Sequence, residues 1–458
     1  MKTVSTLKQT GFFWRPESPR QKLPGILSVS ESGRPVLELI GIYGGNTEES
    51  MSGSNELGRI VGEVEDGDPI TLEGCRYSKR SQSLGGLSKS IVIANYLLKG
   101  VLFEDGEPIR FSRTDFFVQG LDEWLGISGF RYEKRTDPQE LTIHFALPTE
   151  ILYELPDDIS LGFIFGYAFK PGFSKGVINQ KTLISIRCKD LKPVDELMKL
   201  AFKITRFLSF AMGCIVMPEQ LQCRSREITE DHPEAGKVEA RILLYSEKLA
   251  VDESKKDLRS VLFHFSVVRK EFQEIISSWF VSYDRAEPAF NLYFASKSGA
   301  HQYLEGRFLS LAQGIEVLHR MNSRDTFMTE NEFGELNTLL LNACPPERRD
   351  WLTKKLKYAN ELTLRQRLNH MLDPFEGFFG NKRQRKDFVS KVVNTRNYFT
   401  HYDPTIEKSS VSGKNLWSLC MKLEALFQLH LLRLIGIDQE LMGQLVRGSE
   451  ELRRTLNI

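Results

Sequence analysis

An arginine, an amide and a histidine lie close together near the end of the chain, at Arg396, Asn397 and His401. Histidine titrates near neutral pH and can take up or release a proton. Arginine stays charged and can bind an anion through two parallel hydrogen bonds, and an asparagine amide can donate or accept a hydrogen bond. These residue types are therefore candidates for binding an anionic substrate and transferring a proton on it.

The spacing of Arg396 and His401 is by itself a weak indication of function. With 32 Arg and 8 His in 458 residues, chance predicts fewer than one Arg-x4-His pair, and the chain contains three. Arg259–His264 encloses an apolar run typical of core or strand, and Arg365–His370 is typical of an ordinary polar helix face. Only Arg396–His401 lies in a context that points to function.

The helix expected around this pair gives the arginine an unusual place. Five residues share one stripe at helical spacing, namely Val389, Val392, Val393, Arg396 and Phe399. A guanidinium in an apolar stripe needs a partner, an anion or a cleft. Asn397 and His401 stack one turn apart on a neighbouring face, and Pro404 ends the helix soon after. The alternative interpretation is a capping histidine and a structural arginine ion pair.

The chain from about Gln302 to its end is predicted to be helical. An amphipathic stripe runs from Phe308 to Leu318, and further helices are predicted at about 335–343, 347–372, 387–402, 414–435 and 438–456. Residues 300–458 carry 23 Lys+Arg against 19 Asp+Glu, whereas residues 1–299 carry 38 against 41. We therefore predict two domains, residues 1–299 and residues 300–458.

The first 190 residues have the pattern of short strands separated by turns. Asp-Gly turns at Glu65–Ile70 and Glu104–Ile109 have the chemistry of hairpin loops and predict a β-meander. One long helix is predicted at about 194–213, a strand at Arg241–Tyr245 and helices near 265–282. The predicted fold class is α+β and multidomain, with a β-rich N-terminal domain followed by an all-α bundle.

Composition limits the compartment and the cofactors. A net charge of +1 excludes a uniformly basic nucleic-acid-binding surface, and 41% hydrophobic residues are ordinary for a soluble globular protein. No apolar stretch reaches the roughly 20 residues of a membrane helix. The six cysteines lie far apart without a CxxC pair. We therefore expect a cytoplasmic protein in a reducing compartment, without a metal or another cofactor and without a membrane partner.

The sequence resembles the HEPN ribonuclease superfamily and, within it, the ApeA-like HEPN proteins of bacterial anti-phage defence. The motif of Arg396, Asn397 and His401 matches residue by residue, in a helical half that opens with Phe308–Arg320. The N-terminal half is similar to the N-terminal domain of that subgroup at Gly11–Trp14, at Gly120–Gly126 and in the helix after Asp195. The resemblance covers most of the chain.

The resemblance implies a metal-independent endoribonuclease whose active site forms where two protomers bring their motifs together. His401 would transfer the proton of a ribose 2′-OH, and Arg396 would stabilise charge on the phosphorane oxygens. Asn397 would orient the hydroxyl, the phosphate or the imidazole. Because each chain has one such histidine, acid and base would come from the two chains of a homodimer or a higher even oligomer.

The resemblance also suggests partners. RNA, with tRNA as the family analogy, would be the substrate, and four basic residues before the motif would guide it, namely Lys382, Arg383, Arg385 and Lys386. The alternative interpretation of these four residues is a solvated loop without a role in binding. The β-rich half would sense a phage-derived trigger and restrain the nuclease. The main alternative is a catalytically inactive HEPN module that binds nucleotides or assembles proteins. An antitoxin-like partner of another enzyme is less favoured.

Overall fold

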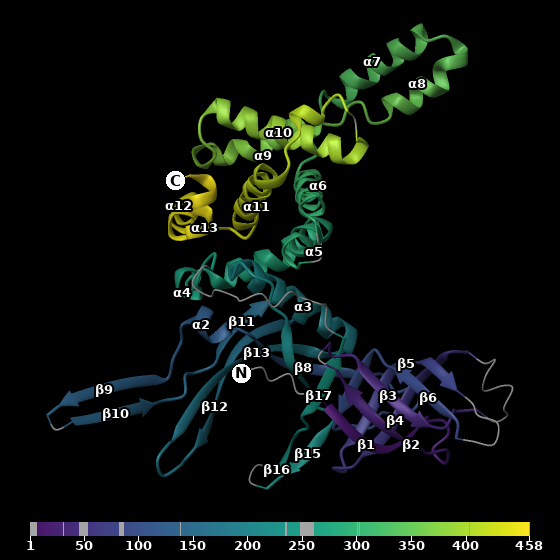
Figure 1. Ribbon diagram of the computed structural model, residues 1–458, viewed down its shortest axis with the longest axis vertical. Helices are drawn as coiled ribbons and strands as arrows, with labels where there is room; N and C mark the ends of the chain where they lie inside the picture. Colours follow the sequence, from purple (N-terminus) through teal and green to yellow (C-terminus); the bar gives the residue numbers. More distant parts are fainter. Residues whose placement is uncertain are drawn as a thin grey trace. The chain divides into compact units, whose positions relative to one another are not determined.

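The structure is a computed structural model that describes residues 7–457 apart from 31, 45–53, 82–86, 138, 234–235, 248–260, 300, 302 and 403. A β-rich region comes first and a helical region follows (Figure 1), which confirms the predicted fold class. The chain packs as two compact units. Most residues up to Ser266 form a β-rich unit, and Val267–Ile458 form a helical unit together with Phe210–Ile215. Among the described residues, no helix has the length and apolar character needed to cross a bilayer.

Six antiparallel strands close into a barrel at the start of the chain. They are β1 (Leu7–Trp14), β2 (Leu23–Val29), β3 (Pro35–Ile40), β4 (Glu56–Val64), β5 (Pro69–Ser81) and β6 (Lys89–Ile93). They follow the order β5-β4-β1-β2-β3-β6, and β6 closes the barrel on the second half of β5. Alternate side chains such as Phe13 and Leu27 fill the interior. Gly25 lets β2 and β3 approach closely, because a Cβ there would lie 2.7 Å from the carbonyl oxygen of Glu38.

The first half of β5 continues into a longer antiparallel sheet. From β5 outward its order is β7-β17-β14-β8-β13-β12-β11. These strands are β7 (Tyr96–Lys99), β8 (Arg110–Val118), β11 (Ile151–Leu155), β12 (Ile159–Lys170), β13 (Val177–Pro193), β14 (Pro218–Arg224) and β17 (Ile242–Ser246). Two separate hairpins complete the β structure, β9 (Phe130–Thr136) with β10 (Gln139–Phe145) and β15 (Thr229–His232) with β16 (Gly236–Glu239).

The two Asp-Gly turns differ in what they connect. Gly67 has a φ of 82° in the turn that joins β4 to its neighbour β5, which confirms the first predicted hairpin. Gly106 also has a positive φ, of 68°, but the strands on either side of it, β7 and β8, are not neighbours in the sheet. The second predicted hairpin is therefore wrong. Turn residues determine the local reversal of the chain, whereas strand pairing depends on distant partners.

Three short or medium helices complete the β-rich unit: α2 (Leu121–Leu125), α3 (Val194–Ala211) and α4 (Phe265–Val268), and α4 reaches the division between the units. The bounds of α3 confirm the long helix predicted near 194–213. The buried Trp124 ring of α2 contacts Phe163, Phe207 and Phe265 at centroid distances of 5.6 to 6.4 Å. This aromatic cluster fastens the helices to the sheet.

The helical unit contains α5 (Phe272–Lys297), α6 (Leu304–Asn322), α7 (Glu330–Ala343), α8 (Arg349–Leu356), α9 (Leu364–Leu372), α10 (Lys382–His401), α11 (Gly413–Leu434), α12 (Gln439–Gly448) and α13 (Glu450–Leu456). The predicted helix at 347–372 is in fact two helices, because Thr363 and Gln366 form a capping box that starts α9. The predicted helix at 438–456 is also two, because the Ser449 side chain caps α13 by accepting from the Leu452 N–H.

α5 packs with the helices that follow it. Tyr293 stacks on Phe427 of α11 with ring centroids 4.9 Å apart, and Lys297 forms an ion pair with the buried Glu424 of α11. The two units therefore divide before α5, whereas composition and charge place the boundary at residues 299–300, and residue 300 lies outside the described part of the chain. Composition does not report which helices share a core.

Candidate functional site

α10 carries the complete arginine, asparagine and histidine motif in its last two turns. The helix begins at Asn381, which forms a capping box with Gln384. It ends because Tyr402 takes a left-handed conformation, with φ 50° and ψ 38°, and its N–H bonds the carbonyl of Tyr398 at 2.6 Å. His401 is the last helical residue and is exposed. Its backbone is thus fixed while its imidazole faces solvent.

The buried face of α10 lies slightly to one side of the predicted stripe. Its fully buried residues are Phe388, Val389, Val392 and Thr395, whereas Val393, Arg396 and Phe399 are half-buried. The Thr395 hydroxyl accepts a hydrogen bond from the Val411 N–H at 3.1 Å, which fastens the chain after the motif to the helix. The prediction that Arg396 sits in the apolar stripe is therefore only partly correct. Arg396 lies at the edge of that stripe.

Arg396 and Asn397 contact each other directly. The Nη1 atom of Arg396 donates to Oδ1 of Asn397 at 3.4 Å. No carboxylate of the described residues forms an ion pair with Arg396. A guanidinium at the edge of a core, held by a neutral amide, retains most of its hydrogen-bonding capacity for an external anion.

His401 lies on a different side of α10 from Arg396. At about 100° per residue, the five positions between the two correspond to about 140° around the helix axis, with Asn397 between them. Both side chains can reach the solvent, but they do not converge on a common point within this helix. An active site that uses the arginine and the histidine on one phosphate therefore needs a ligand that reaches around the helix, or a second copy of the motif.

An exposed tyrosine stands beside the histidine and is a candidate that the motif alone does not reveal. Tyr402 is 70% exposed, and its ring centroid lies 5.8 Å from that of Tyr398. The Tyr398 hydroxyl donates to Oε1 of Glu407 at 3.3 Å, which holds that ring in place. Aromatic faces of this kind can stack on unpaired bases of single-stranded RNA. The signal for Tyr402 in the sequence was its position directly after His401.

The four basic residues predicted to guide RNA lie at the opposite end of α10 from the motif. Lys382, Arg383, Arg385 and Lys386 form the first turns of the helix, which Asn381 starts, so they are not a loop. From Lys386 to His401 the helix rises about 22 Å. Arg385 is already bound, with Nη2 2.7 Å from Oε2 of Glu376. Within one chain, this basic turn therefore does not adjoin the motif.

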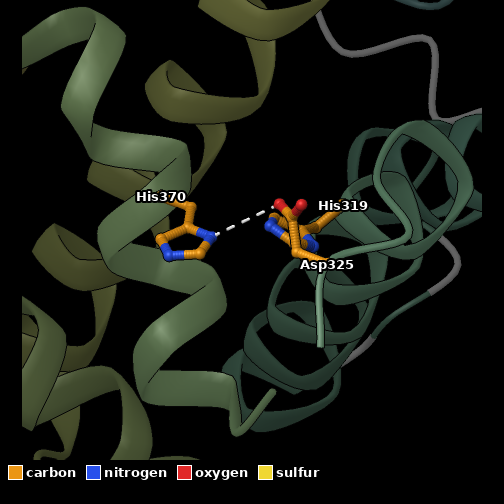
Figure 2. A group of neighbouring side chains, drawn as sticks. All are labelled: His319, Asp325 and His370. Carbon is orange, nitrogen blue, oxygen red and sulfur yellow. Dashed lines mark ion pairs between the residues drawn. The ribbon is translucent and has the colours of Figure 1, made fainter. Parts of the chain in front are cut away.

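A second group of titratable side chains gathers where α6 meets α9. Figure 2 shows His319, Asp325 and His370 facing one another, with Nδ1 of His370 3.8 Å from Oδ2 of Asp325. The imidazole rings of the two histidines lie 5.6 Å apart. His319 and the neighbouring Arg367 are both buried. Arg365 and His370 are both exposed, as expected for a polar helix face, but the fold also brings His370 close to His319 of α6.

Two imidazoles and a carboxylate could in principle hold a metal ion, and their ligand atoms lie within 4.8 Å of one another. Nη1 of Arg367, however, lies 3.2 Å from Nδ1 of His319. Arginine can only donate, so Nδ1 accepts and Nε2 carries the proton of the neutral ring. Burial, followed by the charge of Arg367, lowers the pKa of His319 and keeps the ring neutral. This arrangement favours a structural hydrogen-bond network over a metal centre.

Two family models match the chain. The ApeA N-terminal domain 1 matches residues 8–279, and the Apea-like HEPN domain matches residues 309–441. The first match covers more than half of the chain, and the second includes all of α10 and its motif. No curated protein and no solved structure matches. The two domains occur in the order expected from the resemblance, and the chain therefore belongs to the ApeA-like family of HEPN-type anti-phage defence proteins.

Proposed function

We propose that this protein is a metal-independent endoribonuclease of the cytoplasm that acts in abortive-infection defence against phage. The observation that carries the proposal is the state of Arg396, a half-buried guanidinium bound to the amide of Asn397 and without a carboxylate ion pair among the described residues. Such a group is suited to the oxygens of a phosphodiester. The exposed His401 at the end of the same helix supplies a group that titrates near neutral pH.

The proposed reaction is an attack of a ribose 2′-OH on the adjacent phosphate. His401 of one copy takes the proton of the 2′-OH while the 2′ oxygen forms a bond to phosphorus. The bond between phosphorus and the 5′ oxygen breaks, and His401 of the second copy gives a proton to that oxygen. The products are a 2′,3′-cyclic phosphate and a 5′-OH. Arg396 offsets the charge that develops on the phosphorane oxygens, and Asn397 orients the guanidinium.

The geometry of α10 supports a homodimer. Arg396 and His401 are about 140° apart around the helix, and each chain has one histidine in the motif. Two motifs that face each other across a two-fold axis bring two histidines and two arginines to one phosphodiester. Arg396, Val393 and Asn397 are only half-buried, which leaves this side of α10 available to a second copy.

Cleavage of a synthetic RNA with and without a 2′-deoxy nucleotide at the cut position tests the chemistry. We expect cleavage of the all-ribose substrate in EDTA and none at the 2′-deoxy position, because the nucleophile is missing. His401→Ala removes the proton-transfer group and should slow cleavage by about 10²–10⁴-fold. His144→Ala, at an exposed position of β10, is the matched control and should leave the rate unchanged. Cleavage that needs Mg²⁺ and persists at the 2′-deoxy position would contradict the proposal.

The β-rich domain is proposed to sense a phage-derived trigger and to restrain the nuclease. A nuclease that harms its own host needs such restraint, and the ApeA-type domain makes up the larger part of the chain. Sequencing RNA 3′ ends from infected cells that produce wild-type or His401→Ala protein would identify the substrate, with tRNA as the first expectation. Identical 3′ ends from both strains would argue against RNA cleavage in the cell.

A cavity beside α10 favours a second candidate function, the binding of a nucleotide without cleavage. This cavity has a volume of about 470 Å³ and is lined by Lys391, Lys422 and Asn415 among others. Lys391 forms an ion pair with Asp387, which also lines the cavity, so Lys422 is the group suited to a phosphate and Asn415 is suited to a base edge. Calorimetric titration with ATP and GMP, in wild-type protein and in Lys422→Glu, would test this candidate. Binding that Lys422→Glu abolishes, together with no RNA cleavage, would favour it over the nuclease.

A further inference from the structure

The segment between α6 and α9 forms an arm that has no core of its own. Figure 1 shows α7 and α8 side by side, extending away from the other helices of this unit. Neither helix contains a fully buried residue. We call residues 329–358 the α7–α8 arm. Helices of this length are marginal in water unless an apolar face is covered, so the arm is incomplete as it stands.

The base of the arm is held firmly. Asn360 uses both atoms of its amide on Met328, with Oδ1 accepting from the Met328 N–H at 2.9 Å and Nδ2 donating to the Met328 carbonyl at 3.0 Å. The Asn360 carbonyl also accepts from the Phe327 N–H at 2.8 Å. Arg320 of α6 donates to Glu361 at 2.8 Å. The three hydrogen bonds join the two ends of the arm to each other, and the ion pair of Arg320 with Glu361 links this base to α6.

An apolar stripe runs along the outside of the arm. Phe333 and Leu352 are half-buried within it. Leu336 and Leu340 are nevertheless 39% exposed and Leu339 is 68% exposed. These three leucines recur at the i, i+3, i+4 spacing of one helix face. Trp351 of α8 is 60% exposed. The arm therefore presents leucines and a tryptophan to solvent where a helix surface is normally polar.

The charges of the arm are divided between its two helices. Residues 330–343 contain three glutamates and no lysine or arginine. Residues 346–357 contain five lysines and arginines against one glutamate and one aspartate. The first of these segments thus carries a net charge of −3 and the second +3. A surface with equal and opposite halves is complementary to a copy of itself turned by a two-fold axis.

We propose that the α7–α8 arms of two copies pair with each other across a two-fold axis and form a four-helix bundle. α7 of each copy lies against α8 of the other, so that glutamates meet lysines and arginines on both sides. The leucines of α7 and Trp351 form the centre of this interface. Two helical hairpins that each lack a cover complete one another in this way. The arms join the same two copies whose α10 motifs are proposed to face each other, and their pairing does not depend on cleavage.

Charge reversal tests the pairing in the full-length protein. Glu330→Lys with Glu335→Lys makes the whole arm basic and spares Glu332, which belongs to the capping box of α7. Lys354→Glu with Lys355→Glu makes the whole arm acidic. Sedimentation over a dilution series should show each variant with a dimer dissociation constant at least tenfold higher than wild type, because like charges face each other. An equal mixture of the two variants should form heterodimers of near wild-type affinity.

A chain that carries all four substitutions keeps every local effect on the helices but restores opposite charges, so it should dimerise again. Leu336→Asp with Leu339→Asp should raise the dissociation constant by at least tenfold, whereas Leu141→Asp on the exposed β10 is the control and should not. His401→Ala should leave the dimer intact, so loss of cleavage and loss of pairing are separate results. A monomer at all concentrations, or a dimer that neither the charge nor the leucine variants weaken, would overturn the proposal.

Discussion

Thr395 and Arg396 are adjacent in the sequence but have different tasks. Thr395 is fully buried and accepts the Val411 N–H, whereas Arg396 lies at the edge of the core beside Asn397. One residue stabilises the end of α10, and the next remains available for a ligand. The fold thus places a structural residue directly before the arginine that is proposed to bind the phosphate.

Replacing Thr395 by valine should destabilise the protein without touching the proposed chemistry. The substitution removes the acceptor of the Val411 N–H, and a backbone donor left without a partner costs about 1–3 kcal/mol. Urea unfolding of Thr395→Val should show that loss. His401→Ala, at an exposed helix end, should unfold like wild type. Equal stability of Thr395→Val and wild type would show that the hydrogen bond contributes little.

Replacing Arg396 by lysine should impair cleavage although the charge is kept. An ammonium group lacks the planar pair of donors that can bind two phosphate oxygens, and it also loses the geometry of the contact with Asn397. We expect a fall in the cleavage rate of about 10²-fold or more, with an unchanged melting temperature. Arg324→Lys, at an exposed position, is the control. Full activity of Arg396→Lys would mean that Arg396 acts only as a diffuse charge.

At the scale of the elements, the end of α10 was more predictable than its neighbours. The end of α10 follows from local residues, whereas its start lies five residues before the predicted position 387, because the capping box at Asn381 was not recognised in the sequence. The network of His319, Arg367 and His370 depends instead on the packing of α6 against α9. No periodicity in either helix reports that contact. The same packing places His430 of α11 against the end of α9, where its Nε2 lies 2.8 Å from the Met371 carbonyl.

His430 should make the helical unit sensitive to acid. Burial lowers the pKa of His430 to about 4, the hydrogen bond to Met371 opposes the shift, and Arg433 and His319 add to it. In the unfolded chain the pKa of this histidine is near 6.5, so the unfolded state binds the proton more readily. The stabilisation that the neutral His430 contributes should therefore be fully present above pH 6.5 and should be lost as the pH drops towards 4.

The expected contribution of His430 is about 2 kcal/mol between pH 7 and pH 5. Urea unfolding should show that the free energy of unfolding falls by this amount more in wild type than in His430→Gln when the pH is lowered from 7 to 5. The amide of the glutamine can still donate to Met371. Other titrating groups are common to both proteins and cancel in the comparison. Parallel pH profiles would show that the imidazole accepts its proton equally well in the folded state.

At the scale of the whole molecule, the chain combines a β-rich unit and a helical unit whose core includes α5. Glu424 of α11 is buried between Lys297 of α5 and Arg307 of α6, and the Arg307 contact measures 2.6 Å. Burial raises the pKa of Glu424, but the charges of Lys297 and Arg307 lower it by more. The pKa of Glu424 therefore lies below its usual value. α5 is therefore a structural part of the helical unit.

A fragment of residues 267–458 should be clearly more stable than a fragment of residues 300–458. The shorter fragment lacks Lys297 and Tyr293, so Glu424 loses one of its two cations and Phe427 loses its stacking partner. Breaking a buried ion pair costs about 3–5 kcal/mol. Circular dichroism should show a melting temperature at least about 10 °C lower for residues 300–458, or no cooperative transition. Equal melting temperatures would place α5 outside the folding unit.

The amino-acid sequence by itself determined the fold class, the motif at Arg396, Asn397 and His401, the resemblance to ApeA-like proteins and the position where α10 ends. These features depend on local chemistry, such as caps, turns and spacing along one helix, which a single chain segment carries within itself.

Only the tertiary structure decided how these parts meet. It closed the barrel through β5 and β6, turned the buried face of α10 towards Thr395 and left the α7–α8 arm uncovered. Each of these outcomes depends on contacts between residues far apart in the sequence. The free energy of such contacts depends on which distant surfaces come together, and no local pattern carries that information.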